Sequence, residues 1–162
     1  MNIATNGDID QFDQLMTLNC QQPNSDIIFQ KAIENNQLVF VQHVFERYPD
    51  LVEIDKKYLD RAISHHHPLM LKWLLEYSGN QIDHIQYALE QCIGSDSLSC
   101  FKMLVDQPFF KKDLLSSVEI LEILYIYSDH SPIFTFLIYN HYFQSNEIVK
   151  KKEKRFKKLK NK

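Results

Sequence analysis

The residues of this chain whose type most readily suggests chemistry are three consecutive histidines, at positions 65–67. A metal site needs side chains that converge on one point, whereas consecutive residues on a helix point about 100° apart. The equivalent positions thirty residues earlier, 35–37, hold Asn-Asn-Gln, which are ordinary turn residues. We therefore interpret the histidines as part of a turn between two helices, with an adventitious surface metal site as the alternative.

The sequence contains no recognisable catalytic or cofactor-binding motif. Its three glycines, Gly7, Gly79 and Gly94, are too few and too scattered for a phosphate-binding loop or a dinucleotide fingerprint. There is no His-Glu-x-x-His motif, no zinc-type cysteine pair and no nucleophile elbow. We therefore predict no catalytic residue, no cofactor and no metal, and we expect a protein that is not an enzyme.

The cysteines and the hydropathy bear on the compartment. Cys20, Cys92 and Cys100 are odd in number and show no paired spacing, and Cys92 stands where related segments have alanine. We interpret Cys92 as a small buried thiol and expect a reducing, intracellular compartment, cytoplasmic or nuclear. The first residues show no secretory signal, and the strongest apolar stretch near the end, 133–139, is too short to cross a membrane.

The sequence contains an internal repeat of thirty residues, which predicts the helices and turns that position the histidines and cysteines. Shifted by that length, the sequence aligns with itself without a gap, and apolar or small residues recur in six columns. Such a period is typical of repeat proteins, in which each unit buries its apolar face only against its neighbours. The six columns are Phe29/Leu59/Leu89, Ala32/Ala62/Cys92, Ile33/Ile63/Ile93, Val41/Leu71/Phe101, Val44/Leu74/Leu104 and Phe45/Leu75/Val105.

Within each copy the pattern predicts two helices joined by a tight turn, and the clearest pair covers residues 26–35 and 38–48. The turn column holds Asn36, His66 and Asp96, which are residue types that readily adopt positive φ. We therefore predict positive φ at or next to these three positions. Trp73, which precedes the core pair of the second copy, is expected to be partly buried on its second helix.

The helix boundaries and the unit boundaries follow from the same alignment. Asp26 is the predicted N-cap of its helix, and Pro68 and Pro132 fit the first helical position. The first unit is degenerate, with its first helix nearly absent, and the last carries an insertion of about four residues near 111–117. We predict a repeat domain at residues 1–149, followed by a tail at 150–162. Its units lie near 2–25, 26–56, 57–85, 86–113 and 114–144.

Three segments resemble the ankyrin repeat: AIENNQLVFVQHVF at 32–45, AISHHHPLMLKWLL at 62–75 and CIGSDSLSCFKMLV at 92–105. Each has a small residue late in a first helix, a turn, and a second helix with an apolar pair near its end. The resemblance covers about residues 3–143, but the Thr-Pro-Leu-His and Gly-Ala-Asp-Val-Asn motifs are missing. We therefore expect short irregular connectors in place of β-hairpin fingers.

The resemblance implies an all-α, helical-hairpin repeat solenoid that binds a protein or peptide partner and has no enzymatic activity. Another kind of helix-hairpin repeat is the alternative. The predicted contacts lie on the first helices and in the connectors, where two columns face away from the core and carry mixed charge. These columns are Gln30/Asp60/Glu90 and Lys31/Arg61/Gln91. Phe109 and Phe110, in a connector, form either a hydrophobic plug or an exposed aromatic anchor for the partner.

The tail carries nine Lys or Arg against one Glu, which gives it a charge of +8. Because the net charge of the whole chain is −3, the remaining residues carry −11. We expect the tail to leave the helical core as a solvated extension. It can also act as a nuclear-import signal, as a brace against the acidic body, or as a contact for nucleic acid or acidic lipid. An electrostatic adaptor is therefore the alternative function. Its basic residues would be Lys150, Lys151, Lys152, Lys154, Arg155, Lys157 and Lys158.

Overall fold

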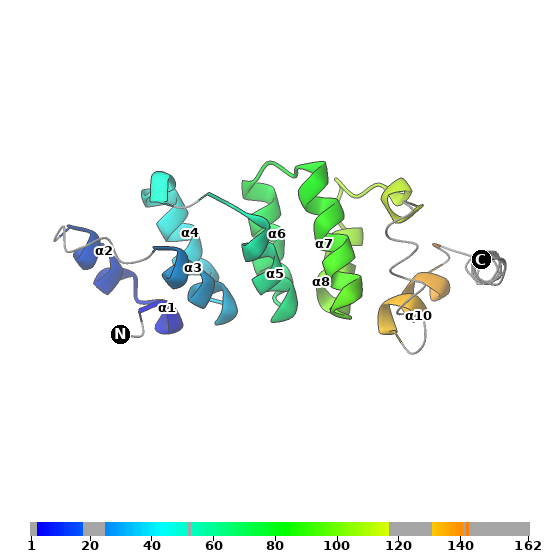
Figure 1. The fold of residues 1–162 in the computed structure, drawn as a ribbon, viewed down its shortest axis with the longest axis horizontal. Helices are drawn as coiled ribbons and strands as arrows, with labels where there is room; N and C mark the ends of the chain where they lie inside the picture. Colours follow the sequence, from blue (N-terminus) through cyan, green and yellow to red (C-terminus); the bar gives the residue numbers. More distant parts are fainter. Residues whose placement is uncertain (1–2, 18–24, 52, 117–130, 141, 143–162) are drawn as a thin grey trace, which may run out of the picture. The chain divides into compact units, whose positions relative to one another are not determined.

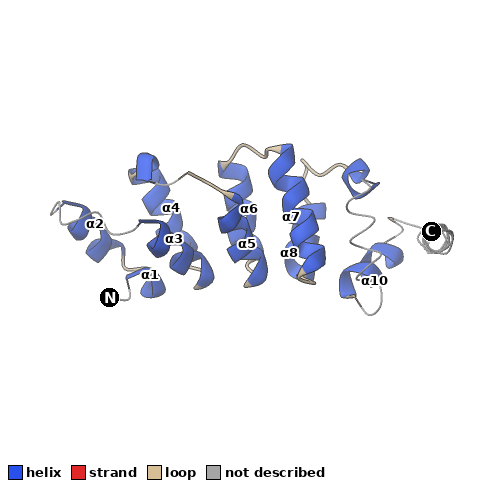
Figure 2. Cartoon of the chain, in the orientation of Figure 1, coloured by secondary structure: helices blue, strands red, loops and turns tan. Residues whose placement is uncertain are grey.

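The computed structural model describes residues 3–17, 25–51, 53–116, 131–140 and 142. Helices and the loops between them account for all of these residues, and no strand occurs among them (Figures 1 and 2). The all-α prediction is confirmed for this part of the chain. In order, the helices are α1 (Ile3–Asn6), α2 (Ile9–Thr17), α3 (Ser25–Glu34), α4 (Leu38–Arg47), α5 (Lys56–Ser64), α6 (Pro68–Tyr77), α7 (Ile82–Gly94), α8 (Leu98–Val105) and α10 (Pro132–Tyr139), with 3-10 turns η1 (Pro49–Leu51) and η2 (Lys112–Ser116).

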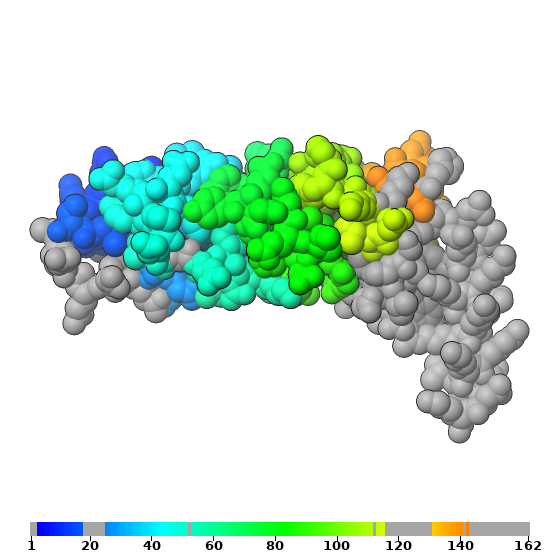
Figure 3. Space-filling view, turned by 90° about the horizontal axis from the view of Figure 1, so that it is seen from above, coloured from blue at the N-terminus to red at the C-terminus, as the bar shows by residue number. Residues whose placement is uncertain are grey.

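The chain divides into two compact units, Met1–His84 and Ile85–Lys162. This division falls beside the boundary expected between the units at 57–85 and 86–113. Within the first unit, α3 packs against α1, α4 and α5, and α5 packs against α6. On the face shown in Figure 3, the described side chains of this unit form a continuous surface, coloured blue to green. Within the second unit, α8 contacts α10.

The cores of the hairpins are built from the predicted columns. Every residue of the six columns is buried, with at most 8% of its surface exposed. A seventh column, Phe40/Met70/Cys100, is equally buried and adds a contact at the start of each second helix. Trp73 is half-buried as expected, and its ring lies 5.2 Å from that of Phe45. The positions that recur as apolar or small residues in the sequence are therefore the positions buried in each hairpin.

The turn between the two helices of each hairpin has the same geometry three times. Asn36, His66 and Asp96 have φ of 56°, 58° and 52°, which confirms the predicted left-handed turn column. In each copy the N–H of the next residue donates to the carbonyl five positions back, as Gln37 does to Ala32 at 2.9 Å. A second bond runs from the turn residue to the carbonyl three positions back, from Asn36 to Ile33 at 3.0 Å. This pair of bonds is the Schellman motif, which satisfies carbonyls at a helix end.

The helix starts agree with the sequence in part. Pro68 and Pro132 stand at or next to the first position of α6 and α10, as predicted. The truncated first helix of the first unit is confirmed, because α1 has only four residues. The prediction for Asp26 was wrong, since α3 begins one residue earlier and Asp26 lies within its first turn. The side chain of Asp26 instead contacts the next hairpin, as described below.

The connectors within the described residues are short turns. Pro49–Leu51 forms a 3-10 turn after α4, and Gly79 and Asn80 close α6 with φ of 76° and 51°. The 3-10 turn η2 occupies the place of the predicted insertion. Irregular connectors are therefore confirmed here, while residues 117–130, part of the last predicted unit, lie outside the described residues.

Replacing Leu74 by alanine is expected to lower the free energy of unfolding by about 2–5 kcal/mol, the usual range for a well-packed core leucine. Leu74 has no exposed surface, whereas Leu69 on the same helix is 66% exposed. Leu69→Ala is therefore the control and should change stability by no more than about 0.5 kcal/mol. Urea unfolding followed by circular dichroism measures both, and similar losses in the two variants would contradict the assignment of the core.

The left-handed turn predicts opposite effects of two substitutions at His66. His66→Gly should leave the unfolding free energy nearly unchanged, because glycine adopts positive φ without strain. His66→Val should cost about 1–2 kcal/mol, since a β-branched residue is disfavoured there. His65, with φ of −96°, is the control, and His65→Val should cost less than His66→Val. Equal losses from the two valine variants in urea unfolding would show that the turn does not impose this conformation.

Candidate functional site

The exposed surface of α3 and α5 carries a network of charged side chains from both helices. Nζ of Lys31 lies 2.6 Å from Oε2 of Glu34, and Nη1 of Arg61 lies 3.1 Å from Oε1 of the same carboxylate. Only 13% of the Glu34 side chain is exposed, whereas the two cations are about half-exposed. The hydrogen bond from Lys31, followed by the charges of Lys31 and Arg61, lowers the pKa of Glu34 below its usual value. Two cations therefore share one carboxylate.

Gln30 extends this network towards the start of α3. Its Nε2 donates to Oδ2 of Asp26 at 2.9 Å, and its Oε1 accepts from Nη2 of Arg61 at 3.3 Å. Of the predicted partner-binding residues, Gln30 is thus bonded directly to Arg61, and Lys31 is joined to Arg61 through Glu34. The side chains are held by one another before any partner arrives. This network of Asp26, Gln30, Lys31, Glu34 and Arg61 is called the first-helix network below.

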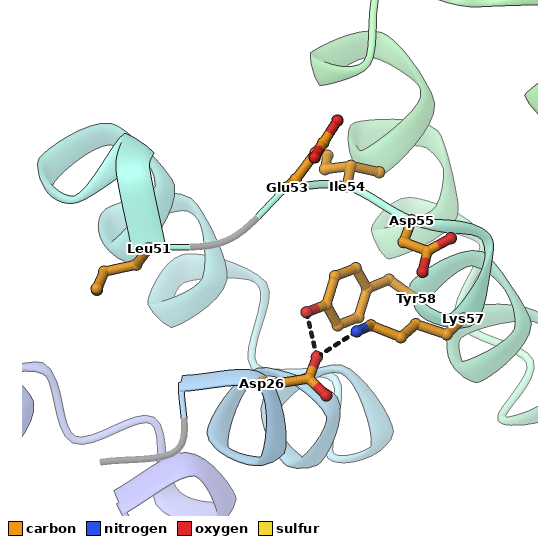
Figure 4. A pocket seen from close by; sticks show the side chains of 7 residues that line it. All are labelled: Asp26, Leu51, Glu53, Ile54, Asp55, Lys57 and Tyr58. Carbon is orange, nitrogen blue, oxygen red and sulfur yellow. Dashed lines mark hydrogen bonds and ion pairs between the residues drawn. The ribbon is translucent and has the colours of Figure 1, made fainter. Parts of the chain in front are cut away.

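Asp26 joins the first-helix network to a pocket of about 470 Å³ beside the connector between α4 and α5. Figure 4 shows its carboxylate facing two groups of α5. The hydroxyl of Tyr58 donates to Oδ1 at 2.5 Å, and Nζ of Lys57 lies 2.7 Å from the same oxygen. Lys57 also lies over the ring of Tyr58, 5.0 Å from its centroid. The connector completes the lining with Leu51, Glu53, Ile54 and Asp55.

The electrostatics of this pocket fix the protonation of its members. The hydrogen bonds from Lys57 and Tyr58 lower the pKa of Asp26 below its usual value. Burial, followed by the hydrogen bond to Asp26, raises the pKa of Tyr58 far above its usual value. At neutral pH Asp26 is therefore a carboxylate and Tyr58 a neutral donor. This arrangement is suited to holding two hairpins together and does not supply a base near neutral pH.

A second carboxylate, Asp13, makes a similar connection between α2 and α4. Nε2 of His43 lies 3.0 Å from Oδ1, the hydroxyl of Tyr48 donates to the same oxygen at 3.1 Å, and Nε of Arg47 lies 3.6 Å from Oδ2. Burial acts to raise the pKa of Asp13, but the hydrogen bonds of His43 and Tyr48 and the nearby positive charge outweigh it, and the pKa is lowered. Asp13 thus repeats, one hairpin earlier, the role that Asp26 plays.

The other predicted contact residues lie on α5, on α7, in the turn after α8 and in the tail. Asp60 is half-buried on α5, and Glu90 and Gln91 are half-buried on α7, where Glu90 accepts from Nε2 of Gln86 at 3.1 Å. Phe109 and Phe110 are half-buried in the turn after α8, so they are neither a fully buried plug nor fully exposed anchors. The seven basic tail residues lie outside the described part of the chain.

The three histidines lie in the inter-helix turn, as predicted. Nε2 of His67 lies 3.0 Å from the carbonyl oxygen of Glu34, and its ring stacks on that of His65 at 6.0 Å. His67 thereby contacts the preceding hairpin. Among the described residues no three His, Cys, Asp or Glu side chains come together in a way that could hold a metal ion.

Two thiols face each other inside the third hairpin. Cys92 on α7 and Cys100 on α8 are free and fully buried, which confirms the buried thiol expected at position 92. Burial, followed by the hydrogen bond with Cys100, raises the pKa of Cys92, and the same hydrogen bond lowers the pKa of Cys100 to about 7. Cys20 lies outside the described residues.

No family model, curated protein or solved structure matches this chain. No helix in the described ranges is both long and apolar enough to cross a bilayer. The assignment of function therefore depends on the geometry of the chain itself.

Sequence reasoning missed the residues that connect the hairpins and one exposed feature. Asp26, Glu34 and Tyr58 were not among the predicted contacts, although each joins α3 to α5. Val39 and Leu69 are 71% and 66% exposed and stand thirty residues apart, so one alignment column carries both. That column was visible in the sequence, whereas the bonds of Asp26 and Glu34 depend on the distance between hairpins.

The lowered pKa of Asp26 predicts a pH-dependent contribution to stability. A carboxylate whose pKa is lower in the folded than in the unfolded chain stabilises the fold above the unfolded value, about pH 4, and loses that effect as the pH falls further. Asp26→Asn should therefore be less stable than the wild type at pH 7. The difference should stay below about 1 kcal/mol, because 41% of the side chain is exposed and its ion pair is screened.

Urea unfolding of the two proteins at pH 7, pH 5 and pH 3.5 measures this difference. It should shrink between pH 5 and pH 3.5, and it should also shrink when salt is added at pH 7. A difference that is the same at all three pH values would show that the carboxylate charge of Asp26 contributes nothing to stability.

Proposed function

We propose that this chain is a non-enzymatic protein-interaction module, an ankyrin-like solenoid of helical hairpins. It binds a protein or peptide partner through the first helices and the connectors, in the cytoplasm or the nucleus. The hairpins support this proposal because the same columns are buried and the same left-handed turn recurs in three copies. A regular frame of this kind presents a surface in a fixed arrangement.

The observation that carries the proposal is the first-helix network. Its exposed members, Lys31 and Arg61, are held at 2.6 Å and 3.1 Å from one shared carboxylate. Ordering long side chains on binding costs about 0.5–1.5 kcal/mol each, so side chains that are already ordered reduce the cost of association. The network offers cations with free donor capacity next to the amide of Gln30. A polar partner with acidic or carbonyl groups fits such a surface.

Affinity capture with the immobilised full chain tests this proposal. The variant Lys31→Glu/Arg61→Glu should bind the partners that the wild type retains at least about tenfold more weakly. This corresponds to a loss of about 1.4 kcal/mol of binding free energy. The matched control is Arg47→Glu/Lys72→Glu, which reverses the same two residue types on α4 and α6 and should retain the partners. Circular dichroism and thermal melting confirm that both variants are folded.

A third variant separates the proposal from the electrostatic adaptor. It replaces the seven basic tail residues, named above, by glutamine in the full chain. Retained capture in this variant, together with loss in Lys31→Glu/Arg61→Glu, supports the interaction module. Loss in the tail variant alone, with capture by the wild type that falls steeply as salt is raised, would identify the tail as the binding element and overturn the proposal.

A further inference from the structure

A second groove lies in the first unit, between the connector after α4 and the end of α6 with the loop that leads to α7. It has a volume of about 480 Å³. Pro49, Asp50, Glu53 and Ile54 line it from the connector, and Tyr77 lines it from α6. We call it the connector groove. It adjoins the pocket of Asp26, with which it shares Glu53 and Ile54, and Figure 4 shows Glu53 extending away from Asp26.

The connector groove carries negative charge without a neighbouring cation in its lining. Asp50 and Glu53 are exposed, and neither takes part in an ion pair found among the described residues. The opposite wall consists of polar groups without a carboxylate, Ser78, Gln81 and His84, whose Nδ1 lies 3.3 Å from the Ser78 hydroxyl oxygen. Residues 1–84 as a whole hold twelve Asp or Glu against six Lys or Arg. The groove therefore favours a cation over an anion.

An aromatic ring beside the two carboxylates narrows the choice of cation. Tyr77 is 47% exposed, and its ring is fixed by Trp73, stacked at 5.1 Å, and by Phe45 at 4.8 Å. A guanidinium group can lie over an aromatic face while it donates to carboxylates, and it does so better than an ammonium group because it is planar and less strongly hydrated. Pro49 and Ile54 can contact the methylene groups of such a side chain.

We propose that the connector groove binds an arginine side chain from a basic segment of the partner protein. This inference rests on the proposed interaction function and adds the chemistry of the partner. The guanidinium contacts the ring of Tyr77 and the carboxylates of Asp50 and Glu53. The partner then meets acidic groups at the groove and cationic groups at the first-helix network, so the two surfaces together define its orientation.

The first test uses the full chain and the peptide acetyl-Gly-Arg-Gly-Arg-Gly-Arg-Gly-amide, which contains no aromatic residue. Isothermal titration calorimetry measures binding, and the emission of Trp73, the only tryptophan, reports where it occurs. We expect binding that changes the emission of Trp73, because its ring stacks on Tyr77. The same peptide with lysine for arginine should bind more weakly.

The deciding variant is Asp50→Asn/Glu53→Gln, which should weaken binding of the arginine peptide about tenfold or more, 1.4 kcal/mol. The matched control, Asp10→Asn/Asp106→Asn, removes two exposed carboxylates that do not line the groove and should change the affinity by less than about twofold, because exposed charges outside the groove are screened by salt. No binding to the wild type, equal weakening in both double variants, or binding that leaves the Trp73 emission unchanged would each overturn the inference.

Affinity capture with the same variants separates this inference from the proposed function. If Asp50→Asn/Glu53→Gln keeps the partners that Lys31→Glu/Arg61→Glu loses, the connector groove is not the arginine site and the interaction function stands. If Lys31→Glu/Arg61→Glu keeps the partners as well, the proposed function fails. Loss in both variants, with retention in the two controls, supports both proposals.

Discussion

The left-handed residue between the two helices of each hairpin is the constraint on which the rest of the structure depends. It reverses the chain within three residues, and the carbonyls of Ala32, Ala62 and Cys92 accept the N–H five positions ahead. The two helices can then pack closely, because the residue that accepts this bond is small in every copy. The burial of the apolar columns follows from this reversal, since it fixes which face of the second helix meets the first.

Aromatic contacts, such as those of Phe45 with Trp73 and Tyr77, and a small number of carboxylates connect the hairpins of the first unit. Asp13, Asp26 and Glu34 each contact donors on another helix, and the pKa of each is lowered, although for Glu34 the largest cause is Lys31 on the same helix. Such pairs contribute little stability where they are exposed. Their larger effect is on position, because they orient long side chains on the surface that the first helices present. The apolar columns stabilise each hairpin, and the carboxylates fix the positions of the charged side chains on its surface.

The sequence predicted the periodic part of this structure well. The columns and the left-handed turn at Asn36, His66 and Asp96 recur every thirty residues, and the prolines at or next to the first position of α6 and α10 reflect local helix geometry. The start of α3 was wrong by one residue, because an aspartate in the first turn and an N-cap aspartate have nearly the same sequence signature. Tyr58 and the connector groove were missed. Each comes from residues that do not recur in the other copies, so an alignment of the repeats carries no signal for them.

The two buried thiols of the third hairpin provide a way to measure the local opening of that hairpin. Cys92 and Cys100 have no exposed surface, so a thiol reagent can reach them only when α7 and α8 separate. The thiolate is the reactive form, and separation of the helices also breaks the hydrogen bond with Cys92 that lowers the pKa of Cys100, so the uncovered thiol reacts as an ordinary cysteine. The rate of its modification under native conditions is therefore a measure of the free energy of local opening in that hairpin, without any introduced label.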